Sequence, residues 1–372
     1  MKRNLVFLAL LLFVLAACGG SGTSVPANTG PTTQQMGGAI QGNTLALANV
    51  VTTLAGEAWT SGTADGTGSA ARFYFPGGLA TDGTNLYETD NHAIRKIVIA
   101  TGEVTTIAGV AGHAGFADGT GSAALFNTPV GITTDGTNLY VADGRNYVIR
   151  KIVIATGEVT TLAGSSGQPG STDGTGSAAR FSYFWGITTD GKNLYVTDTG
   201  NCTIRKIVIA TGEVTTLAGY AGQAGTDDGT GTAALFTYPS ALTTDGANLY
   251  VADYANTIRK IVLSTGVVTT LAGSPGVQGS VDGTGSAAQF YDPEGITTDG
   301  KNLYVSDSSN NIIRKVVIST GEVITIAGSA GPEGAVDGSG SAARFAYPMG
   351  IITDGKRLFV ADNDDYTIRR IK

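Results

Sequence analysis

Residues 129–164 read PVGITTDGTNLYVADGRNYVIRKIVIATGEVTTLAG, and variants of this string occur six times in the 372-residue chain. The TDG phrase recurs at steps of 53, 55, 55, 54 and 55 residues, and a VTTLAG-like phrase recurs at the same steps. A period of this length indicates one supersecondary unit that is stacked repeatedly, because a single unit cannot bury its own apolar face.

Four short strands are expected within this unit. Gly131–Thr134 and Asn138–Ala142 flank an Asp-Gly turn, and Val148–Ala155 and Glu158–Ala163 flank a Thr-Gly turn. Apolar residues occupy both parities in the third of these strands, which indicates a strand that is buried on both faces. Because each four-stranded blade of a β-propeller lies between two neighbours, the pattern favours a propeller.

The two ends of the repeat array are incomplete in complementary ways. The first VTTLAG phrase begins at Val51 with no strands before it, and the last third-strand phrase, Ile368–Lys372, has no VTTLAG phrase after it. We therefore predict an all-β fold over residues 46–372, a six-bladed β-propeller of four-stranded antiparallel blades. In this fold the N-terminal strand pairs with the C-terminal blade and closes the ring.

The repeated phrases PxGIxxDG, NLYVAD, NxxIRKI and TGxVTTLAG together resemble the NHL repeat in all six copies. The resemblance implies a six-bladed propeller that serves as a binding platform. The chain departs from the pattern at Phe184–Ile187 and Pro239–Leu242, where the first phrase is broken. It also carries a DGTG-type segment between successive blades.

The first residues resemble the signal peptide of a bacterial lipoprotein. Lys2 and Arg3 precede the apolar run Leu5–Ala17, which is shorter than the ~20 residues of a membrane span. The run ends in Leu-Ala-Ala-Cys, which resembles the lipobox and implies cleavage before Cys18 and lipidation of that residue. Residues 1–17 are therefore expected to be removed.

Residues 18–45 are then the lipidated Cys18 and a flexible linker rich in Gly, Ser and Thr. Several acyl chains would anchor the protein durably to a membrane. We expect an exported protein of the bacterial cell envelope, and Gly19 after the cysteine favours the outer membrane where there is one.

Composition and motifs exclude several classes of function. A net charge of -7 and a pI near 4.9, without a basic patch, argue against nucleic acid as a partner. The two histidines cannot form a three-His zinc site, and no GxSxG, HExxH or CxxC motif is present. We expect no catalytic residue, no metal and no cofactor. The alternatives left open are a propeller-type hydrolase or lyase with an axial metal, and weak Ca²⁺ binding by the DGTG segments.

Each copy also carries an Asp at the end of its second strand and an Arg in its third strand. These strands are antiparallel neighbours, and six equal copies indicate structural ion pairs rather than a single catalytic site. The residues are Asp90, Asp143, Asp198, Asp253, Asp307, Asp362, Arg95, Arg150, Arg205, Arg259, Arg314 and Arg369.

The copies differ most in the loop between the second and third strands and at the residue that opens the first strand. Propeller topology places both on one face, and loops on a rigid scaffold commonly carry binding residues. We predict that this face of a monomeric chain binds a protein, peptide or glycan; drift in unconstrained loops is the alternative. The candidates are Trp185, Glu294, Met349, Val130, Ser240, Tyr147, Tyr254, Tyr366 and His92.

Overall fold

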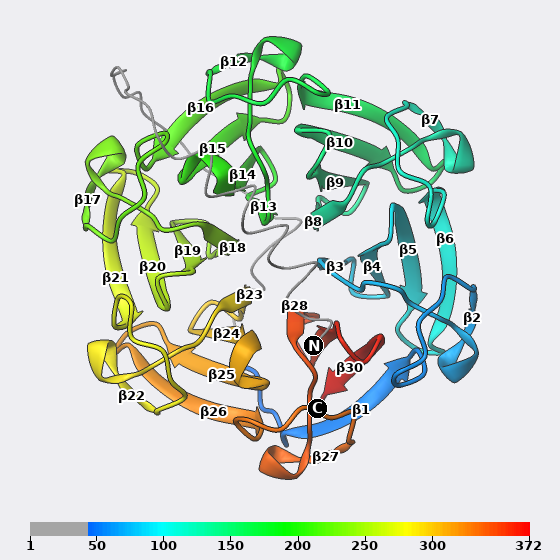
Figure 1. Cartoon of the computed structure of the whole chain (residues 1–372), viewed down its shortest axis with the longest axis vertical. Coiled ribbons are helices and arrows are strands. Elements are labelled where there is room, and N and C mark those ends of the chain that lie inside the picture. Colours follow the sequence, from blue (N-terminus) through cyan, green and yellow to red (C-terminus); the bar gives the residue numbers. More distant parts are fainter. Residues whose placement is uncertain (1–43) are drawn as a thin grey trace.

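The computed structural model describes residues 44–372, which form a closed ring of six antiparallel sheets around a central axis (Figure 1). The predicted six-bladed, all-β propeller is confirmed. The predicted signal peptide, Cys18 and the linker up to residue 43 lie outside the described residues. Among residues 44–372, no helix has the length and hydropathy that a membrane span requires.

The strands of each blade, in chain order, have the following bounds. Blade 1 contains β2 (Gly66–Thr67), β3 (Leu79–Thr81), β4 (Asn85–Asp90), β5 (Ala93–Val98) and β6 (Glu103–Gly109). Blade 2 contains β7 (Gly119–Thr120), β8 (Pro129–Thr134), β9 (Asn138–Asp143), β10 (Val148–Val153) and β11 (Glu158–Gly164). Blade 3 contains β12 (Gly174–Thr175), β13 (Ile187–Thr189), β14 (Asn193–Asp198), β15 (Thr203–Val208) and β16 (Glu213–Ala218).

The second half of the ring follows the same plan. Blade 4 contains β17 (Gly229–Thr230), β18 (Pro239–Thr244), β19 (Asn248–Asp253), β20 (Thr257–Val262) and β21 (Val267–Gly273). Blade 5 contains β22 (Gly283–Thr284), β23 (Pro293–Thr298), β24 (Asn302–Asp307), β25 (Ile312–Val317) and β26 (Glu322–Gly328). Blade 6 contains β27 (Gly338–Ser339), β28 (Pro348–Thr353), β29 (Leu358–Asp362), β30 (Thr367–Ile371) and β1 (Val50–Ala55).

Every blade has one strand more than the four predicted. The extra strand is two residues long, comes from the DGTG-type segment, and pairs with the outermost long strand; in blade 3, for example, Gly174 faces Val214. A short 3-10 turn follows it, such as η3 (Gly176–Ala178), whose Gly176 has a φ of 56°. The segment therefore folds down over the outer edge of the blade rather than forming a free loop.

Ring closure occurs as predicted. The N-terminal strand β1 lies between β30 and β27 (Figure 1), with Thr52 opposite Arg370 and Val51 opposite Gly338. Two further backbone hydrogen bonds join Val50 and Lys372, at 3.0 and 3.2 Å. The last blade therefore has no open edge at this position.

The apolar core is divided into six clusters, one between each pair of neighbouring blades. The cluster between blades 2 and 3 contains Tyr140 and Ile149 from one side and Leu194 from the other. A phenylalanine after each DGTG-type segment is fully buried. These residues are Phe73, Phe126, Phe181, Phe236, Phe290 and Phe345. The sixth cluster joins blade 6 to blade 1 through Phe359 and Leu86, so the packing is as closed as the strand pairing.

Candidate functional site

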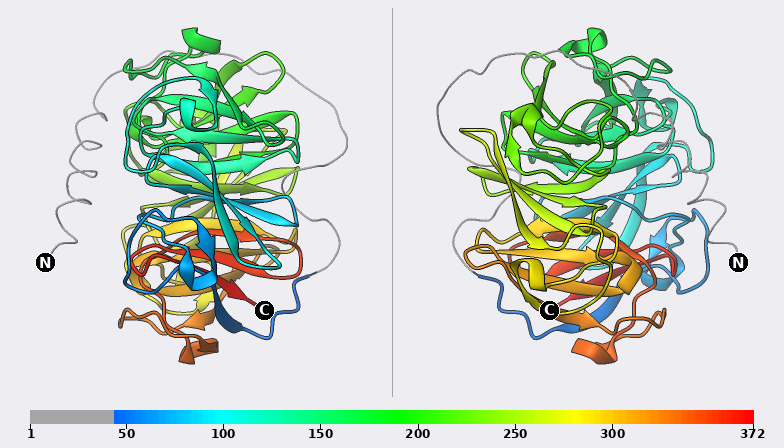
Figure 2. Two further views of the ribbon diagram at one scale, coloured as in Figure 1. Left: turned by 90° about the vertical axis from the view of Figure 1, so that its right-hand side faces the viewer. Right: turned by 60° about the vertical axis from the view of Figure 1, so that its left-hand side comes forward.

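The ring has two faces of different character. The Asp-Gly turns after each first strand and the Thr-Gly turns after each third strand lie on one face, which we call the constant-turn face. The loops after each second strand and the residues that open each first strand lie on the opposite face, which we call the variable-loop face. The left view of Figure 2 shows the ring from its edge, so that the two faces lie at its two sides.

The constant-turn face is held by a repeated carboxylate clamp. In blade 2, Asp135 Oδ1 accepts hydrogen bonds from the backbone of Thr137 and Asn138, at 2.9 and 2.6 Å, and Oδ2 accepts one from the hydroxyl of Tyr140 at 2.8 Å. These bonds satisfy the turn locally, in the manner of an Asx turn. The TDG aspartates therefore stabilise the frame.

The predicted Asp–Arg pairs are present in all six blades. Both side chains of each pair are fully buried, and the N–O distance is 2.7 to 3.0 Å in five blades. In blade 4 the distance from Arg259 to Asp253 is 3.8 Å, and burial raises the pKa of Asp253 to about 7. Asp253 is instead held by the backbone N–H groups of Thr237 and Ala255, at 3.0 Å each.

Each arginine also contacts a second carboxylate, from the DGTG-type segment. Arg205 Nη2 donates to Asp173 at 2.7 Å, and the same carboxylate accepts bonds from the backbone and hydroxyl of Thr216. The guanidinium carbon lies 5.0 Å from the centre of the Phe181 ring, in cation–π geometry. The carboxylate of the DGTG-type segment, for which weak Ca²⁺ binding was the alternative, therefore binds the arginine and threonine of its own blade.

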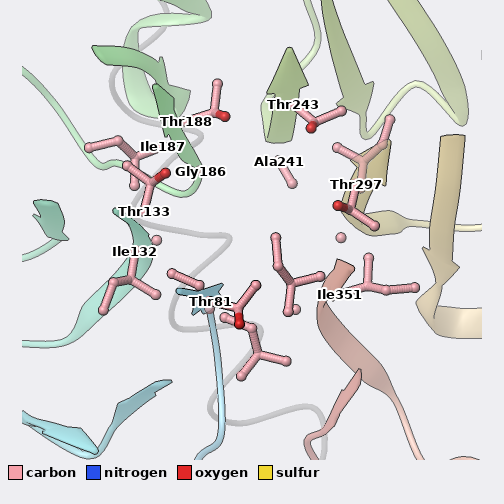
Figure 3. A pocket seen from close by; sticks show the side chains of 18 of the residues that line it. Thr81, Ile132, Thr133, Gly186, Ile187, Thr188, Ala241, Thr243, Thr297 and Ile351 are labelled. Carbon is pink, nitrogen blue, oxygen red and sulfur yellow. The ribbon is translucent and has the colours of Figure 1, made fainter. Parts of the chain in front are cut away.

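A cavity of about 660 Å³ follows the propeller axis, and the first strands of all six blades line it (Figure 3). Four of the predicted partner-binding residues line this cavity near the variable-loop face. They are Val130, Trp185, Glu294 and Met349. Their side chains are between 2% and 9% exposed, so they contact the channel rather than bulk solvent.

Ser240, at the equivalent position of blade 4, has a different role. Its side chain is fully buried, and its hydroxyl donates to the backbone oxygen of Pro293 at 2.7 Å. It joins blade 4 to blade 5 and does not line the cavity. Ser240 was predicted to contact a partner; the structure instead places it between two blades, because its small hydroxyl bonds the neighbouring strand.

Glu294 is the centre of a polar cluster at the channel mouth. Its Oε1 accepts hydrogen bonds from the hydroxyls of Tyr254 in blade 4 and Tyr347 at the entry to blade 6, both at 2.5 Å. Its Oε2 is buried without a hydrogen-bond partner among the described residues. Burial raises the pKa of Glu294 to about 8, against a smaller lowering by the two tyrosine hydrogen bonds.

Three further aromatic positions complete the description of this face. Tyr183 was not among the predicted residues; its ring lies 6.0 Å from that of Trp185, and its hydroxyl is buried without a partner among the described residues. Tyr147 is half-buried, and Tyr366 packs against the apolar cluster between blades 6 and 1. A Tyr directly before the PxGI phrase, as in Tyr347, is the sequence signal that could have marked this cluster.

His92, Tyr147 and Tyr366 occupy one equivalent backbone position, immediately before the third strand, where φ lies between 58° and 72°. At this position His92 Nδ1 accepts a hydrogen bond from the backbone of Thr128 in the next blade, at 2.9 Å. Asn311 makes the same contact to Tyr347, at 2.8 Å. The position joins neighbouring blades, and half-buried His92 uses its Nδ1 for that contact.

Glu88 is a buried carboxylate with no equivalent in the other blades, which carry Val at this position, as in Val141. Its Oε1 accepts a bond from the backbone of Gly77 at 3.1 Å, and its Oε2 has no partner among the described residues. Burial raises the pKa of Glu88 well above its ordinary value. Within residues 44–372, no group of three or more His, Cys, Asp or Glu side chains is arranged to hold a metal.

Comparison with known proteins finds relatives with the same repeat, although no family model matches the chain. Protein SUPPRESSOR OF QUENCHING 1, chloroplastic, of Arabidopsis thaliana is 31% identical over 319 residues, which are 80% of this chain and 30% of that protein. NHL repeat-containing protein 2 of Homo sapiens is 29% identical over 336 residues, which are 79% of this chain and 46% of that protein. The chain thus spans less than half the length of these relatives.

Solved structures share the fold. A protein of unknown function from Bacteroides thetaiotaomicron has a TM-score of 0.65 at 25% identity, over 87% of this chain and 75% of that one. An auxiliary nutrient binding protein from the same organism has a TM-score of 0.63 at 17% identity, over 87% and 76%. Virginiamycin B lyase from Staphylococcus aureus has a TM-score of 0.50 at 17% identity, over 87% and 98%.

Proposed function

The chain is an NHL-repeat β-propeller, and on this premise we propose that it is a lipid-anchored binding scaffold of a bacterial cell envelope. Its variable-loop face would hold a protein, peptide or glycan partner. The single observation that carries this proposal is the channel mouth. There, equivalent positions of a regular ring carry Val130, Trp185, Glu294 and Met349, four different chemistries around one cavity.

The frame itself does not require this variety. The residue that follows each of these positions is Gly or Ala in every blade, and the turn clamps of the opposite face repeat almost unchanged. Gly77 and Trp185 occupy equivalent positions, so the packing of the ring does not require a large side chain there. A large aromatic side chain at the mouth of a cavity therefore supports a role in recognition. The solved nutrient-binding neighbours support a binding role at the level of the fold alone.

The proposed anchor would reach the ring along the path by which the chain enters it. Leu45 is buried, and its backbone N–H donates to Asp299 Oδ2 at 3.1 Å. Asp299 lies in an Asp-Gly turn, so the chain enters the propeller from the constant-turn face. A lipid at Cys18 would therefore be connected to the ring through that face.

Partner capture tests the binding role. The full chain, its Trp185→Ala variant and its Lys192→Ala variant are each used to capture partners from an envelope fraction of the source cell. Lys192 is exposed in the Asp-Gly turn of the same blade, on the opposite face, and serves as the matched control. We expect one partner to be retained by the wild type and Lys192→Ala and lost by Trp185→Ala. Equal retention by all three would contradict the site.

Metabolic labelling with a radioactive fatty acid tests the anchor. Cys18→Ser is expected to abolish labelling and to release the protein from the membrane fraction, because stable anchoring requires the acyl chains. Cys202→Ser is the control, since Cys202 is buried in blade 3. Labelling that persists in Cys18→Ser would refute the lipoprotein assignment.

A propeller-type hydrolase or lyase with an axial metal is the second candidate, although residues 44–372 contain no group of three His, Cys, Asp or Glu side chains arranged to hold that metal. Glu294 favours it, because a carboxyl whose pKa is raised to about 8 beside a cavity has the properties of a general acid. The lyase neighbour supports this candidate through the fold alone. Metal analysis of the purified chain separates the two functions: one bound metal per chain would favour the enzyme, and its absence would favour the scaffold.

A further inference from the structure

The cavity on the axis is of a size that binds small molecules. Its volume of about 660 Å³ falls within the range of roughly 300–1,000 Å³ that is usual for ligand pockets. Because the first strands of all six blades line it, the rigid frame fixes its walls (Figure 3). A ligand would therefore meet preformed groups.

Four threonine hydroxyls open onto this cavity, one from each of blades 2 to 5. They belong to Thr133, Thr188, Thr243 and Thr297, and Figure 3 shows their oxygen atoms on the side toward the channel. The side chains of the last three are only 3% to 7% exposed. None of the four makes a side-chain hydrogen bond to another residue of the described range 44–372.

The next threonine along each of these strands has a structural role, because its hydroxyl bonds the backbone of the same blade. Thr189 donates to the backbone oxygen of Asn193 at 2.8 Å, and Thr244 donates to that of Asn248 at 2.8 Å. At the channel position, by contrast, blades 1 and 6 carry Ala80 and Ile352. Packing therefore does not require a hydroxyl there, and the hydroxyls that face the cavity are free to exchange water for the hydroxyl groups of a ligand.

The remaining walls are apolar and carry little charge. Leu or Ile precedes each of these channel positions, and Trp185, Val130 and Met349 surround the mouth. Among the described residues that line the cavity, the ionisable side chains are Glu294, Asp82 and Asp354, and none is basic. Asp82 and Asp354 are bound within their own turns.

Glu294 adds a polar atom to the mouth. Its Oε2 has no partner among the described residues, while Tyr254 and Tyr347 hold Oε1. Because burial raises the pKa of this carboxyl to about 8, it is mostly uncharged at pH 7. The mouth therefore lacks the fixed negative charge that would favour a cation.

We propose that the channel binds the end of a neutral glycan, with sugar hydroxyls paired to the threonines of blades 2 to 5 and a sugar C–H face against Trp185. This rests on the proposed binding function and names the ligand class of the same site. A sugar ring matches the walls because it presents both hydroxyl groups and an apolar face. A charged ligand would find no opposite charge that is free to pair with it.

The test uses the full chain on an array of neutral, anionic and amino-bearing saccharides, with calorimetry on each saccharide that binds. The Thr188→Val/Thr243→Val variant removes two hydroxyls at almost constant volume. Thr215→Val, at an exposed position of β16, is the matched control, and Thr188→Ser/Thr243→Ser keeps both hydroxyls. Melting curves establish that each variant is folded.

We expect a neutral saccharide to bind the wild type and Thr215→Val equally, and the double valine variant to bind about tenfold more weakly or worse. The double serine variant should keep most of the affinity. Preference for a charged saccharide, binding that the valine variant leaves unchanged, or no saccharide binding at all would overturn the proposal. If the wild type still captures an envelope partner through Trp185, the binding function stands and only the ligand class fails.

Discussion

At the scale of single residues, the six buried arginines carry much of the frame. Arg205 donates through Nη1 to Asp198 at 2.7 Å and to the backbone oxygen of Arg180 at 3.0 Å. Its Nη2 reaches Asp173 and the backbone oxygen of Thr172. One side chain thus joins three segments that are separated in the sequence.

Arg205→Ala should lower the free energy of unfolding by about 3–5 kcal/mol, because it leaves the buried Asp198 carboxylate without its charged partner. Urea denaturation followed by circular dichroism measures this loss. Lys206→Ala, at the adjacent half-buried position, is the control and should cost less than about 1 kcal/mol. Superimposable curves for Arg205→Ala and wild type would disprove the role of the ion pair.

Glu88→Val should stabilise the protein by about 1–3 kcal/mol at pH 7, because it replaces a buried carboxyl with the residue that the other blades carry. Burial and the charge of Asp90 raise the pKa of Glu88, and Arg95 lowers it by less. A carboxyl whose pKa is raised on folding destabilises the folded wild type as pH rises. The gain in stability of Glu88→Val over the wild type should therefore grow with pH. Thermal melts from pH 5 to pH 9 check this, and a smaller benefit at alkaline pH would be inconsistent with it.

Glu294→Gln should flatten the dependence of stability on pH. Burial, together with Asp292 and Asp364, raises the pKa of Glu294 from 4.5 to about 8, while Tyr254 and Tyr347 oppose the shift. The group therefore favours the folded state most at acidic pH, and wild-type stability should fall between pH 4.5 and 8, by at most about 1.4 kcal/mol per pH unit. Chemical denaturation at several pH values gives the free energy of unfolding against pH for the wild type and for Glu294→Gln. The slope should be smaller for the variant, and parallel curves would contradict the raised pKa of Glu294.

At the scale of the element, the blade owes its fifth strand to one carboxylate. Asp173 directly precedes β12, and its bonds to Arg205 and Thr216 fix the DGTG-type segment against β16. The side chain of Asp173 is 35% exposed, so solvent screens part of this interaction.

Asp173→Ala should lower the free energy of unfolding by about 1–2 kcal/mol, less than Arg205→Ala, because the carboxylate that is lost is partly exposed to solvent. Millimolar calcium and EDTA should leave the melting temperature of the wild type unchanged, since the carboxylate oxygens are already bonded internally. Differential scanning fluorimetry measures both effects. A calcium-dependent rise in melting temperature that Asp173→Ala abolishes would instead establish a calcium site.

The blade also shows which elements the sequence could predict. The four long strands were predictable because each carries several apolar residues between turn signals, as in Val148–Ala155. The two-residue strands contain Gly followed by Thr or Ser and have no periodicity, so no pattern marked them. The cluster of Glu294, Tyr254 and Tyr347 joins three blades across 40 and 53 positions of sequence, and only the closed ring brings those residues together.

At the scale of the whole molecule, the ring is held by its first strand and by the residues just before it. The segment that enters β1 is fastened to blade 5 through Leu45 and Asp299, and β1 itself completes blade 6. Leu45 packs in the cluster between blades 5 and 6 with Tyr304 and Ile326. The chain therefore enters the ring on the constant-turn face, at the place where β1 closes the ring.

A series of three truncations separates the two contributions. Removal of residues 1–43 should leave the melting temperature unchanged, and removal of residues 1–49 should cost about 1–3 kcal/mol, because the burial of Leu45 is lost while β1 remains. Removal of residues 1–56 should expose the edges of β30 and β27 and cause aggregation, since both strands lose their partner. Light scattering and thermal melts on the three chains measure this order. A soluble chain without residues 1–56 that melts at the wild-type temperature would mean that the ring does not depend on closure by β1.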